Sequence, residues 1–319
     1  MSASVPLSIV TSLYRSGPYL EEFHRRAGAA AQKTGPGYEI ILVNDGSPDN
    51  VLEQAIALQK RDTHVLVIDL SRNFGHHQAL ITGLAYAEGE TVFLLDCDLE
   101  EDPEWLASFR DTYLSTGADV VYGVQRNRKG NWFERLSGWA FYKTFNLLSA
   151  TPIPPNAVTA RLMSRRYVDA LLRYEERELF LHGLLPHAGY RQVALGVDKR
   201  SKGETSYNVA RKLSLLVNAI TSFSNKPLIF IFYTGLLICG GAAAASLWLI
   251  HRRLFHGIPI MGWSSLIVSV WFLGGLTILF LGILGIYLAK VFSEMKRRPR
   301  TIVRQVFPAP RAPRDASGS

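Results

Sequence analysis

Cysteine is scarce in this sequence: among 319 residues there are only Cys97 and Cys239, far apart along the chain. So few cysteines exclude a fold held together by a disulfide framework and fit a reducing compartment. The N-terminal segment also lacks the basic start and the long apolar run of a secretory signal peptide. We therefore expect the chain to begin with the first strand of a cytoplasmic domain.

Charged residues are absent from two long stretches, residues 228–250 and 265–288. Each stretch is long enough to cross the hydrocarbon core of a bilayer, roughly 30 Å, as a helix. Two buried helices of a soluble domain are the alternative. Basic residues precede the first stretch and follow the second: Arg211, Lys212, Lys226, Lys290, Lys296, Arg297, Arg298 and Arg300. The positive-inside rule therefore predicts a transmembrane hairpin with both flanks in the cytoplasm.

This pattern sets the expected organisation of the chain. The expected parts are a cytoplasmic domain at 1–206, an amphipathic juxtamembrane helix at 207–226, the hairpin at 227–290 and a basic tail at 291–319. The end of the tail is expected to be disordered. We expect a multi-pass protein of the cytoplasmic (inner) membrane, with both termini in the cytoplasm.

The net charge of +8 indicates an anionic partner, which means a membrane surface, a phosphorylated substrate or nucleic acid. Nucleic acid is disfavoured, because the basic residues cluster beside the apolar stretches and no nucleic-acid-binding module is recognisable.

Apolar runs alternate with helix-like stretches in the first part of the chain. The predicted strands are 7–13, 38–44, 64–70, 91–96 and 118–124, and the predicted helices lie near 19–33, 51–61, 77–87 and 103–115. The alternation predicts an α/β fold with a mostly parallel, Rossmann-like sheet. Ligands of such sheets bind beyond the carboxyl ends of the strands. The segments NDGSPDN (44–50) and DCDLEED (96–102) fall at those ends.

Residues 131–149 follow a different pattern, with Trp132, Phe133, Leu136 and Trp139 at helical spacing and basic residues between them. This predicts an amphipathic helix at a membrane interface. A helix that faces the core of the domain is the alternative.

Carboxylates are concentrated after the fourth predicted strand. Asp96, Asp98 and Glu100 alternate, so an extended chain places them on one face, and their hard oxygen ligands suit Mg²⁺ or Mn²⁺. Cys97 points to the other face and is expected to pack in the core. Glu101, Asp102 and Glu104 surround Pro103 and fit the first turn of a helix. An Asp-x-Asp pair alone also occurs in ordinary loops, so its place at a strand end carries the prediction.

Asp45 lies in a string, NDGSP, that is typical of a turn. At the carboxyl end of the second strand, it is also placed to accept hydrogen bonds from a nucleobase. The histidines of GHHQ (75–78) diverge on a helix, so we expect a helix start or a nucleotide-side contact there rather than a metal site.

Taken together, VNDGSPDN (43–50), LSRNFGHHQALITGLAYAEGE (70–90) and DCDLEEDPE (96–104) resemble the inverting family 2 glycosyltransferases with the GT-A fold. The closest similarity is to the polyprenyl-phosphate branch. RLMSRRYVDALL (161–172), KGETSY (202–207) and the basic segment after the second apolar stretch add to it. The resemblance implies transfer of one sugar from a nucleotide-sugar, preferably a UDP-sugar, to undecaprenyl phosphate for cell-envelope glycan or lipid modification. It also implies a homo-oligomer, such as a tetramer.

The resemblance also implies site residues. Those for the nucleotide-sugar are Ser12, Leu13, Tyr14, Asp45, Asn73, Gly75, Asp96, Cys97 and Asp98. Those for the metal are Asp98 and Glu100, and those for the acceptor phosphate are Arg128, Arg135, Arg200 and Lys202. The implied catalytic set is Asp96, Asp98, Arg128, Arg135 and Arg200. A solvated surface position is the alternative for each arginine.

The chain departs from the family pattern at two places. Asn156 stands where the family often has an aspartate suggested as a base, and Ser206 stands where it has a lysine. A phosphate acceptor does not require that base, because its second pKa near 6 leaves it largely dianionic at neutral pH. These departures keep open a degenerate, non-catalytic binding protein. A processive polysaccharide synthase is disfavoured because no Arg-Trp pair occurs in the sequence.

Overall fold

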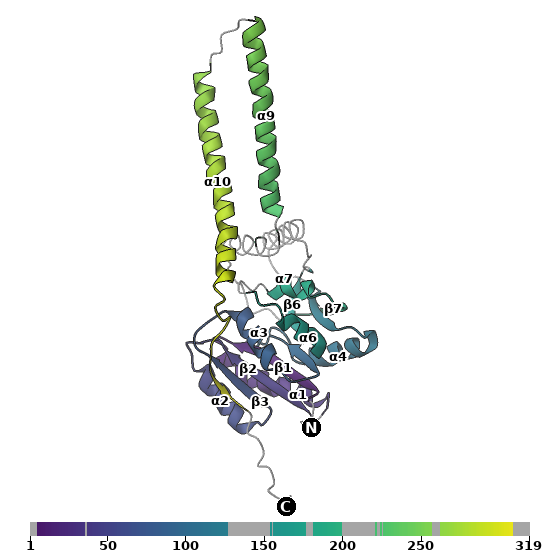
Figure 1. Ribbon diagram of the computed structural model, residues 1–319. Coiled ribbons are helices and arrows are strands. Elements are labelled where there is room, and N and C mark those ends of the chain that lie inside the picture. The colour runs from purple at the N-terminus through teal and green to yellow at the C-terminus, as the bar shows by residue number, and fades with distance from the viewer. Residues whose placement is uncertain are drawn as a thin grey trace, which may run out of the picture. The chain divides into compact units, whose positions relative to one another are not determined.

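The computed structural model describes residues 5–35, 37–126, 154, 156–176, 181–199, 221, 224, 226–256 and 262–308 (Figure 1). The chain forms two compact units. Among the described residues, the first unit holds the sheet and its helices together with residues 298–308. The second holds the long helices α9 (Lys226–His256) and α10 (Trp263–Met295).

The first unit is built on an eight-stranded sheet with the order β7-β5-β6-β4-β1-β2-β3-β8. Its strands are β1 (Leu7–Leu13), β2 (Tyr38–Asn44), β3 (Val65–Leu70), β4 (Thr91–Leu94), β5 (Val120–Gln125), β6 (Ala157–Ser164), β7 (Gln192–Val197) and β8 (Val303–Phe307). Strands β1 to β4 are parallel to their neighbours among themselves, and β5 is parallel to β7. Strands β6 and β8 run antiparallel to their partners. The predicted α/β fold with a mostly parallel sheet is confirmed.

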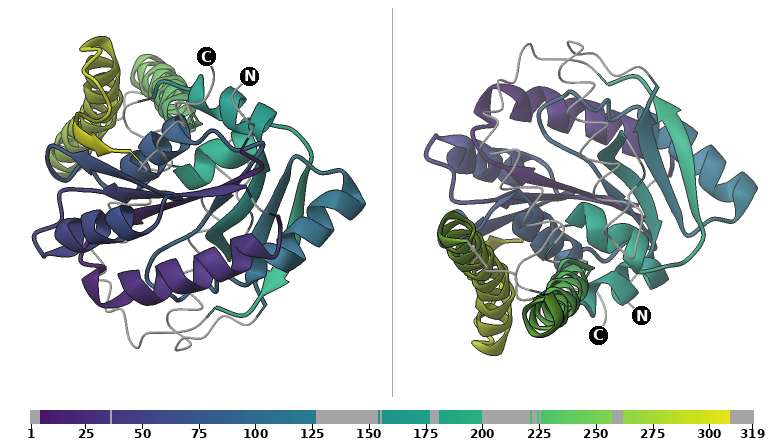
Figure 2. Two further views of the ribbon diagram at one scale, coloured as in Figure 1. Left: turned by 90° about the horizontal axis from the view of Figure 1, so that it is seen from below. Right: turned by 90° about the horizontal axis from the view of Figure 1, so that it is seen from above.

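Helices cover both faces of this sheet (Figure 2). They are α1 (Gly17–Gln32), α2 (Val51–Arg61), α3 (His76–Tyr86), α4 (Trp105–Thr116), α6 (Arg165–Leu172) and α7 (Leu181–His187). One core cluster joins α1, α2 and α4 to the strands, and the other joins α3, α6 and α7 to them. Every residue of β1 is buried, including the polar Ser8, Thr11 and Ser12, because helices cover both faces of the sheet.

The predicted elements agree closely with this arrangement. The strands at 7–13 and 38–44 and the helix at 51–61 have the predicted bounds, and the others differ by a few residues. The predicted amphipathic helices at 131–149 and 207–226 lie outside the described residues, apart from single positions near the end of the second.

Strand β8 was not predicted, because residues 303–307 lie in the segment expected to be a basic tail. They pair antiparallel with β3 at the edge of the sheet. Ser71 N donates to Ile302 O at 2.9 Å, and Thr82 and Thr301 share a hydrogen bond of 2.8 Å between their hydroxyls. The segment after the last helix is therefore part of the α/β unit.

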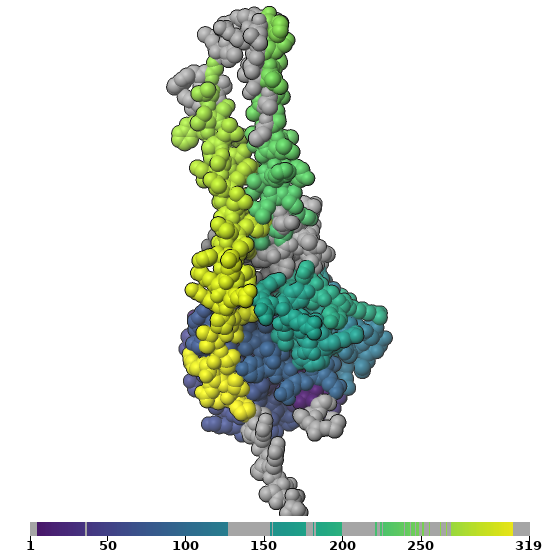
Figure 3. Space-filling model, viewed as in Figure 1, coloured from purple at the N-terminus to yellow at the C-terminus, as the bar shows by residue number. Residues whose placement is uncertain are grey.

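The second unit contains one helical segment, Ser269–Met295, that is long and apolar enough among the described residues to cross a membrane. Large apolar side chains such as Trp271, Phe272 and Ile278 are exposed along α10, whose surface is visible in Figure 3. In α9, a shorter apolar stretch covers Lys226–Ala242. Within this unit, Tyr287 Oη donates to Ser224 O at 2.6 Å, which ties α10 to the residues before α9.

Candidate active site

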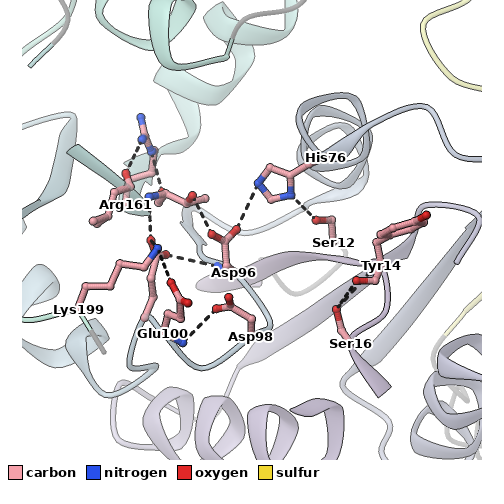
Figure 4. A network of polar contacts seen from close by, with 12 residues as sticks. Ser12, Tyr14, Ser16, His76, Asp96, Asp98, Glu100, Arg161 and Lys199 are labelled. Atoms are coloured by element: carbon pink, nitrogen blue, oxygen red, sulfur yellow. Dashed lines mark hydrogen bonds and ion pairs between the residues drawn. The ribbon is translucent and has the colours of Figure 1, made fainter. Parts of the chain in front are cut away.

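The chain segments that follow β1, β2, β3 and β4 meet at one edge of the sheet, because these strands are parallel. Ser12 of β1, His76 after β3 and Thr159 of β6 form a network of polar contacts around Asp96, which follows β4 (Figure 4). The site therefore lies where parallel sheets bind their ligands.

Asp96 is the centre of this network. Its Oδ2 accepts a hydrogen bond from Thr159 Oγ1 at 3.0 Å. Its Oδ1 lies 3.3 Å from His76 Nε2, yet this buried oxygen has no partner of hydrogen-bond geometry within the described part of the chain. His76, the first residue of α3, also contacts Ser12 Oγ through Nδ1 at 2.8 Å. Asp96 thus presents an oxygen with unused bonding capacity.

The pairing of β4 with β6 explains why Thr159 meets Asp96. Leu94 is opposite Arg161 in this antiparallel pair, so continuing the register by two residues brings Asp96 opposite Thr159. Neither Thr159 nor Arg161 was predicted as a site residue. Arg161 is buried and donates to Thr159 O and Val158 O, each at 2.9 Å. Burial lowers the pKa of Arg161, opposed by nearby groups that include Glu101 and Asp96.

Residues 96–102, here called the acidic loop, turn sharply after Asp98. Leu99 has a left-handed φ of 61°, and Glu100 N donates to Asp98 Oδ1 at 3.0 Å. Lys199, which follows β7, places Nζ 3.1 Å from Glu100 Oε2. The two predicted metal ligands are therefore neighbours on one short turn. Lys199 was not predicted, since it lies far from this turn in the sequence.

Magnesium and manganese fit this donor set. Within the described residues, no group of three or more side chains is already arranged as a metal site. Mg²⁺, however, is usually held by one or two carboxylates together with substrate phosphates and water. Asp98 and Glu100 supply such carboxylates on the turn that follows Asp96, whose Oδ1 has no hydrogen-bond partner among the described residues. The residues present are thus suited to a metal that binds together with a diphosphate.

The prediction that Glu101 lies in the first turn of a helix is wrong. Glu101 is fully buried, and its carboxylate accepts hydrogen bonds from Thr159 N at 2.9 Å and from Asp96 N at 3.4 Å. Burial, with the charge of Asp96, raises the pKa of Glu101 to about 8. Helix α4 begins only at Trp105, so Glu101 instead joins the acidic loop to β6.

Asp102 and Glu104 are held by a cation from another helix. Arg26 of α1 donates to Asp102 Oδ1 at 2.7 Å and, through Nε, to Glu104 Oε1 at 2.8 Å. These ion pairs raise the pKa of Arg26. The second half of the acidic cluster is therefore partly neutralised by Arg26 of α1 and is separate from the predicted metal ligands Asp98 and Glu100.

Asp45 holds the loop that leads into α3. It is buried, and its two oxygens accept hydrogen bonds from Phe74 N at 2.7 Å and Gly75 N at 3.0 Å. Burial raises the pKa of Asp45, and these backbone amides oppose the shift. Gly46 has φ +56°, and a Cβ there would lie 2.4 Å from Asn73 N. The structure thus brings Asp45, Asn73 and Gly75 together, but the Asp45 carboxylate already has two protein donors.

The remaining predicted contacts of the nucleotide-sugar differ in exposure. Tyr14 is 46% exposed, whereas Leu13 is fully buried and offers its carbonyl oxygen to Asp45 N at 3.0 Å. The Cys97 side chain is buried in the core, as expected for the opposite face, so only its backbone is left to contact a donor. The predicted phosphate-binding residues Arg128, Arg135, Arg200 and Lys202 lie outside the described residues.

Comparison with known proteins identifies the family of the chain. Residues 8–172 match the glycosyl transferase family 2 domain. A putative glycosyltransferase of Mycobacterium tuberculosis is 50% identical over 94% of this chain and 88% of its own length. The uncharacterized glycosyltransferase YkcC of Bacillus subtilis is 34% identical over 96% of both chains. The prophage bactoprenol glucosyl transferase homolog of Escherichia coli is 31% identical over 94% of this chain and 99% of its own length. The predicted resemblance is confirmed, and the chain belongs to glycosyl transferase family 2.

Proposed function

We propose that this protein transfers one sugar, with inversion, from a nucleotide-sugar to undecaprenyl phosphate. The product is a polyprenyl-phosphate sugar for cell-envelope glycan or lipid modification, and a UDP-sugar is the preferred donor. The carrying observation is Asp96, whose buried Oδ1 has no hydrogen-bond partner among the described residues, followed by Asp98 and Glu100 on the same turn at the ligand-binding edge of the sheet. Similarity to bactoprenol glucosyl transferases along nearly the whole chain supports the lipid acceptor.

The chemistry requires control of charge more than removal of a proton. An oxygen of the acceptor phosphate attacks the anomeric carbon, and the bond from that carbon to the donor diphosphate breaks with its electron pair going to the diphosphate. Attack from the opposite face inverts the anomeric configuration. Two anions must therefore approach one carbon, and preorganised positive charge lowers the barrier.

Different residues of the chain are proposed to bind the metal, the donor and the acceptor phosphate. Asp98 and Glu100 would hold Mg²⁺ or Mn²⁺, which offsets the charge of the leaving diphosphate when bound. His76 contacts both Ser12 and Asp96 and orients the carboxylate of Asp96 toward the nucleotide-sugar. Arg128, Arg135, Arg200 and Lys202 remain the proposed ligands of the acceptor phosphate. Their guanidinium and ammonium groups suit phosphate oxygens.

A membrane location follows from the acceptor, which is a lipid. Segment Ser269–Met295 supports one membrane-spanning helix. We propose that α9 is the second helix of a hairpin, that the catalytic unit and both termini are cytoplasmic, and that residues 131–149 lie at the interface. A homo-oligomer, such as a tetramer, belongs to the same proposal.

The test is a panel of donors. Full-length protein in detergent is mixed with Mg²⁺ or Mn²⁺, undecaprenyl phosphate and UDP-, GDP- and dTDP-sugars, and new glycolipid is detected by mass spectrometry. One metal-dependent product with a single sugar on phosphate is expected. Products with several sugars would favour a processive synthase. Nucleotide binding without any product would favour a non-catalytic binding protein.

A further inference from the structure

Lys199 is a charged residue of the site that this mechanism leaves without a role. Its ammonium group lies 3.1 Å from Glu100 Oε2 and 3.9 Å from Glu101 Oε1 (Figure 4). Its side chain is only 25% exposed. The ammonium group is therefore a mostly buried positive charge held beside the carboxyl groups of Glu100 and Glu101.

The partner of Lys199 is one of the two carboxylates proposed to hold the metal. A divalent cation that used Glu100 would meet the ammonium group at the same carboxylate. Like charges repel strongly where water is partly excluded. Metal and Lys199 therefore compete for Glu100 as long as no further negative charge enters the site.

The donor supplies that negative charge. Its diphosphate compensates the metal and also offers oxygens to an ammonium group, which is a compact cation on a flexible stem. The site can then hold the metal on Glu100 while Lys199 turns toward the diphosphate.

We propose that Lys199 forms an ion pair with Glu100 in the donor-free enzyme. When metal and nucleotide bind together, its ammonium group shifts to the donor diphosphate. Lys199 is thus a positioning residue that makes metal binding depend on the donor. This inference rests on the proposed function, because it takes Glu100 as a metal ligand.

The experiment measures Mn²⁺ binding rather than turnover. Full-length protein in detergent is titrated with Mn²⁺, with and without UDP, and the free ion is followed by electron paramagnetic resonance. We expect wild type to bind Mn²⁺ weakly alone and more tightly with UDP. We expect Lys199→Gln to bind Mn²⁺ about fivefold or more tighter without UDP, the lower end of typical coupling between two ligands. The increase in Mn²⁺ affinity that UDP causes should be correspondingly smaller for Lys199→Gln than for wild type.

Two controls isolate the charge at this position. Lys199→Arg keeps the charge and should resemble wild type. Lys60→Gln removes the same charge from an exposed position on α2 and should also resemble wild type. Should Lys199→Gln fail to fold, Lys199→Met gives the same comparison with an apolar side chain of similar length.

The outcomes separate the two proposals. If wild type binds Mn²⁺ with UDP but Lys199→Gln binds it no tighter than wild type without UDP, this inference is overturned and the proposed function stands. If Lys199→Gln weakens Mn²⁺ binding under both conditions, Lys199 only supports the structure, and the inference is again overturned. If wild type binds no Mn²⁺ under either condition, the metal role fails, and the inference fails with it.

Discussion

Arg304 of the last strand lies 3.4 Å from the buried carboxylate of Asp69, measured from Nη1 to Oδ2. The other oxygen of Asp69 accepts a hydrogen bond from Asn44 Nδ2 at 2.8 Å. Asn44 Oδ1 in turn accepts from Ser47 N at 3.2 Å. A residue from the C-terminal segment is therefore linked through two buried side chains to the turn that contains Asp45.

The first prediction compares two exposed arginines whose partners differ in burial. Arg304 is 59% exposed and its partner Asp69 is 4% exposed, whereas Arg61 and its partner Glu21 are 61% and 64% exposed. Arg304→Ala should lower the free energy of unfolding by about 1–2 kcal/mol, because it leaves a buried carboxylate poorly compensated. Arg61→Ala should cost about 0.5 kcal/mol or less. Equal effects in denaturant titrations would show that the burial of Asp69 has no consequence.

The second prediction concerns the proposed metal ligand. Asp98→Asn keeps an oxygen that can accept the hydrogen bond from Glu100 N but removes the negative charge. Metal-dependent sugar transfer should fall by about 100-fold or more, the scale of losing one electrostatic contact to the transition state. Asp111→Asn, at an exposed position on α4, should leave transfer unchanged. Full activity of Asp98→Asn in the glycolipid assay would remove Asp98 from the metal site.

The third prediction uses a matched pair of glycines. Gly46 and Gly117 both have left-handed φ angles, +56° and +63°, but only the Cβ added at Gly46 would meet backbone atoms, at 2.4 Å. Gly117→Ala should therefore cost about 1 kcal/mol from backbone conformation alone. Gly46→Ala should separate the two loops that Asp45 joins and weaken UDP binding about tenfold or more, an effect of about 1.4 kcal/mol or more. Calorimetric titration with UDP measures this. If both variants bind UDP like wild type, the packing of these loops does not shape the donor site.

The fourth prediction concerns the effect of pH on stability at the opposite end of the sheet. The side chain of Asp119 is 5% exposed, accepts a hydrogen bond from Ser164 Oγ at 3.0 Å and is paired with Arg166. Burial acts to raise the pKa of Asp119, but Arg166 and Ser164 outweigh it, so the pKa lies below its ordinary value of 3.8. A lowered folded-state pKa stabilises the protein above that ordinary value, and the stabilisation is lost as the pH falls through the folded-state pKa.

Asp119→Asn should therefore lower the Tm by a constant amount between about pH 5 and pH 7. The difference from wild type should shrink below about pH 4, where the wild-type carboxyl becomes protonated and uncharged like the amide. Thermal unfolding followed by circular dichroism measures this. A difference that stays constant down to pH 3 would mean that the charge of Asp119 does not contribute.

Much of the fold could be predicted because the information is local. The buried run of β1 and the turn residues after β2 identify their elements without knowledge of distant contacts. The position of Asp96 and Asp98 follows from the same logic, since parallel strands end at one edge. The family resemblance adds functional roles that local pattern alone does not supply.

The features that were missed depend on distant contacts. Thr159 reaches Asp96 only because β6 pairs antiparallel with β4, and a sequence pattern does not specify that register. The residues around Glu101 have the composition of a helix start. Glu101 is nevertheless buried, because the acidic loop contacts β6. Apolar and polar residues alternate too weakly at 303–307 to indicate a strand within a basic segment. The strand forms because these residues pair with the edge strand β3.

Strand β8 also constrains the order in which the protein can be made. Its residues follow the apolar helix α10 in the chain, whereas its partner β3 is synthesised long before. An unpaired edge strand is a template for association with other chains. During translation the edge of β3 therefore stays open until the ribosome has released the apolar segment. Completion of the sheet is in this way a late step of biogenesis, which follows synthesis of the segment proposed to enter the membrane.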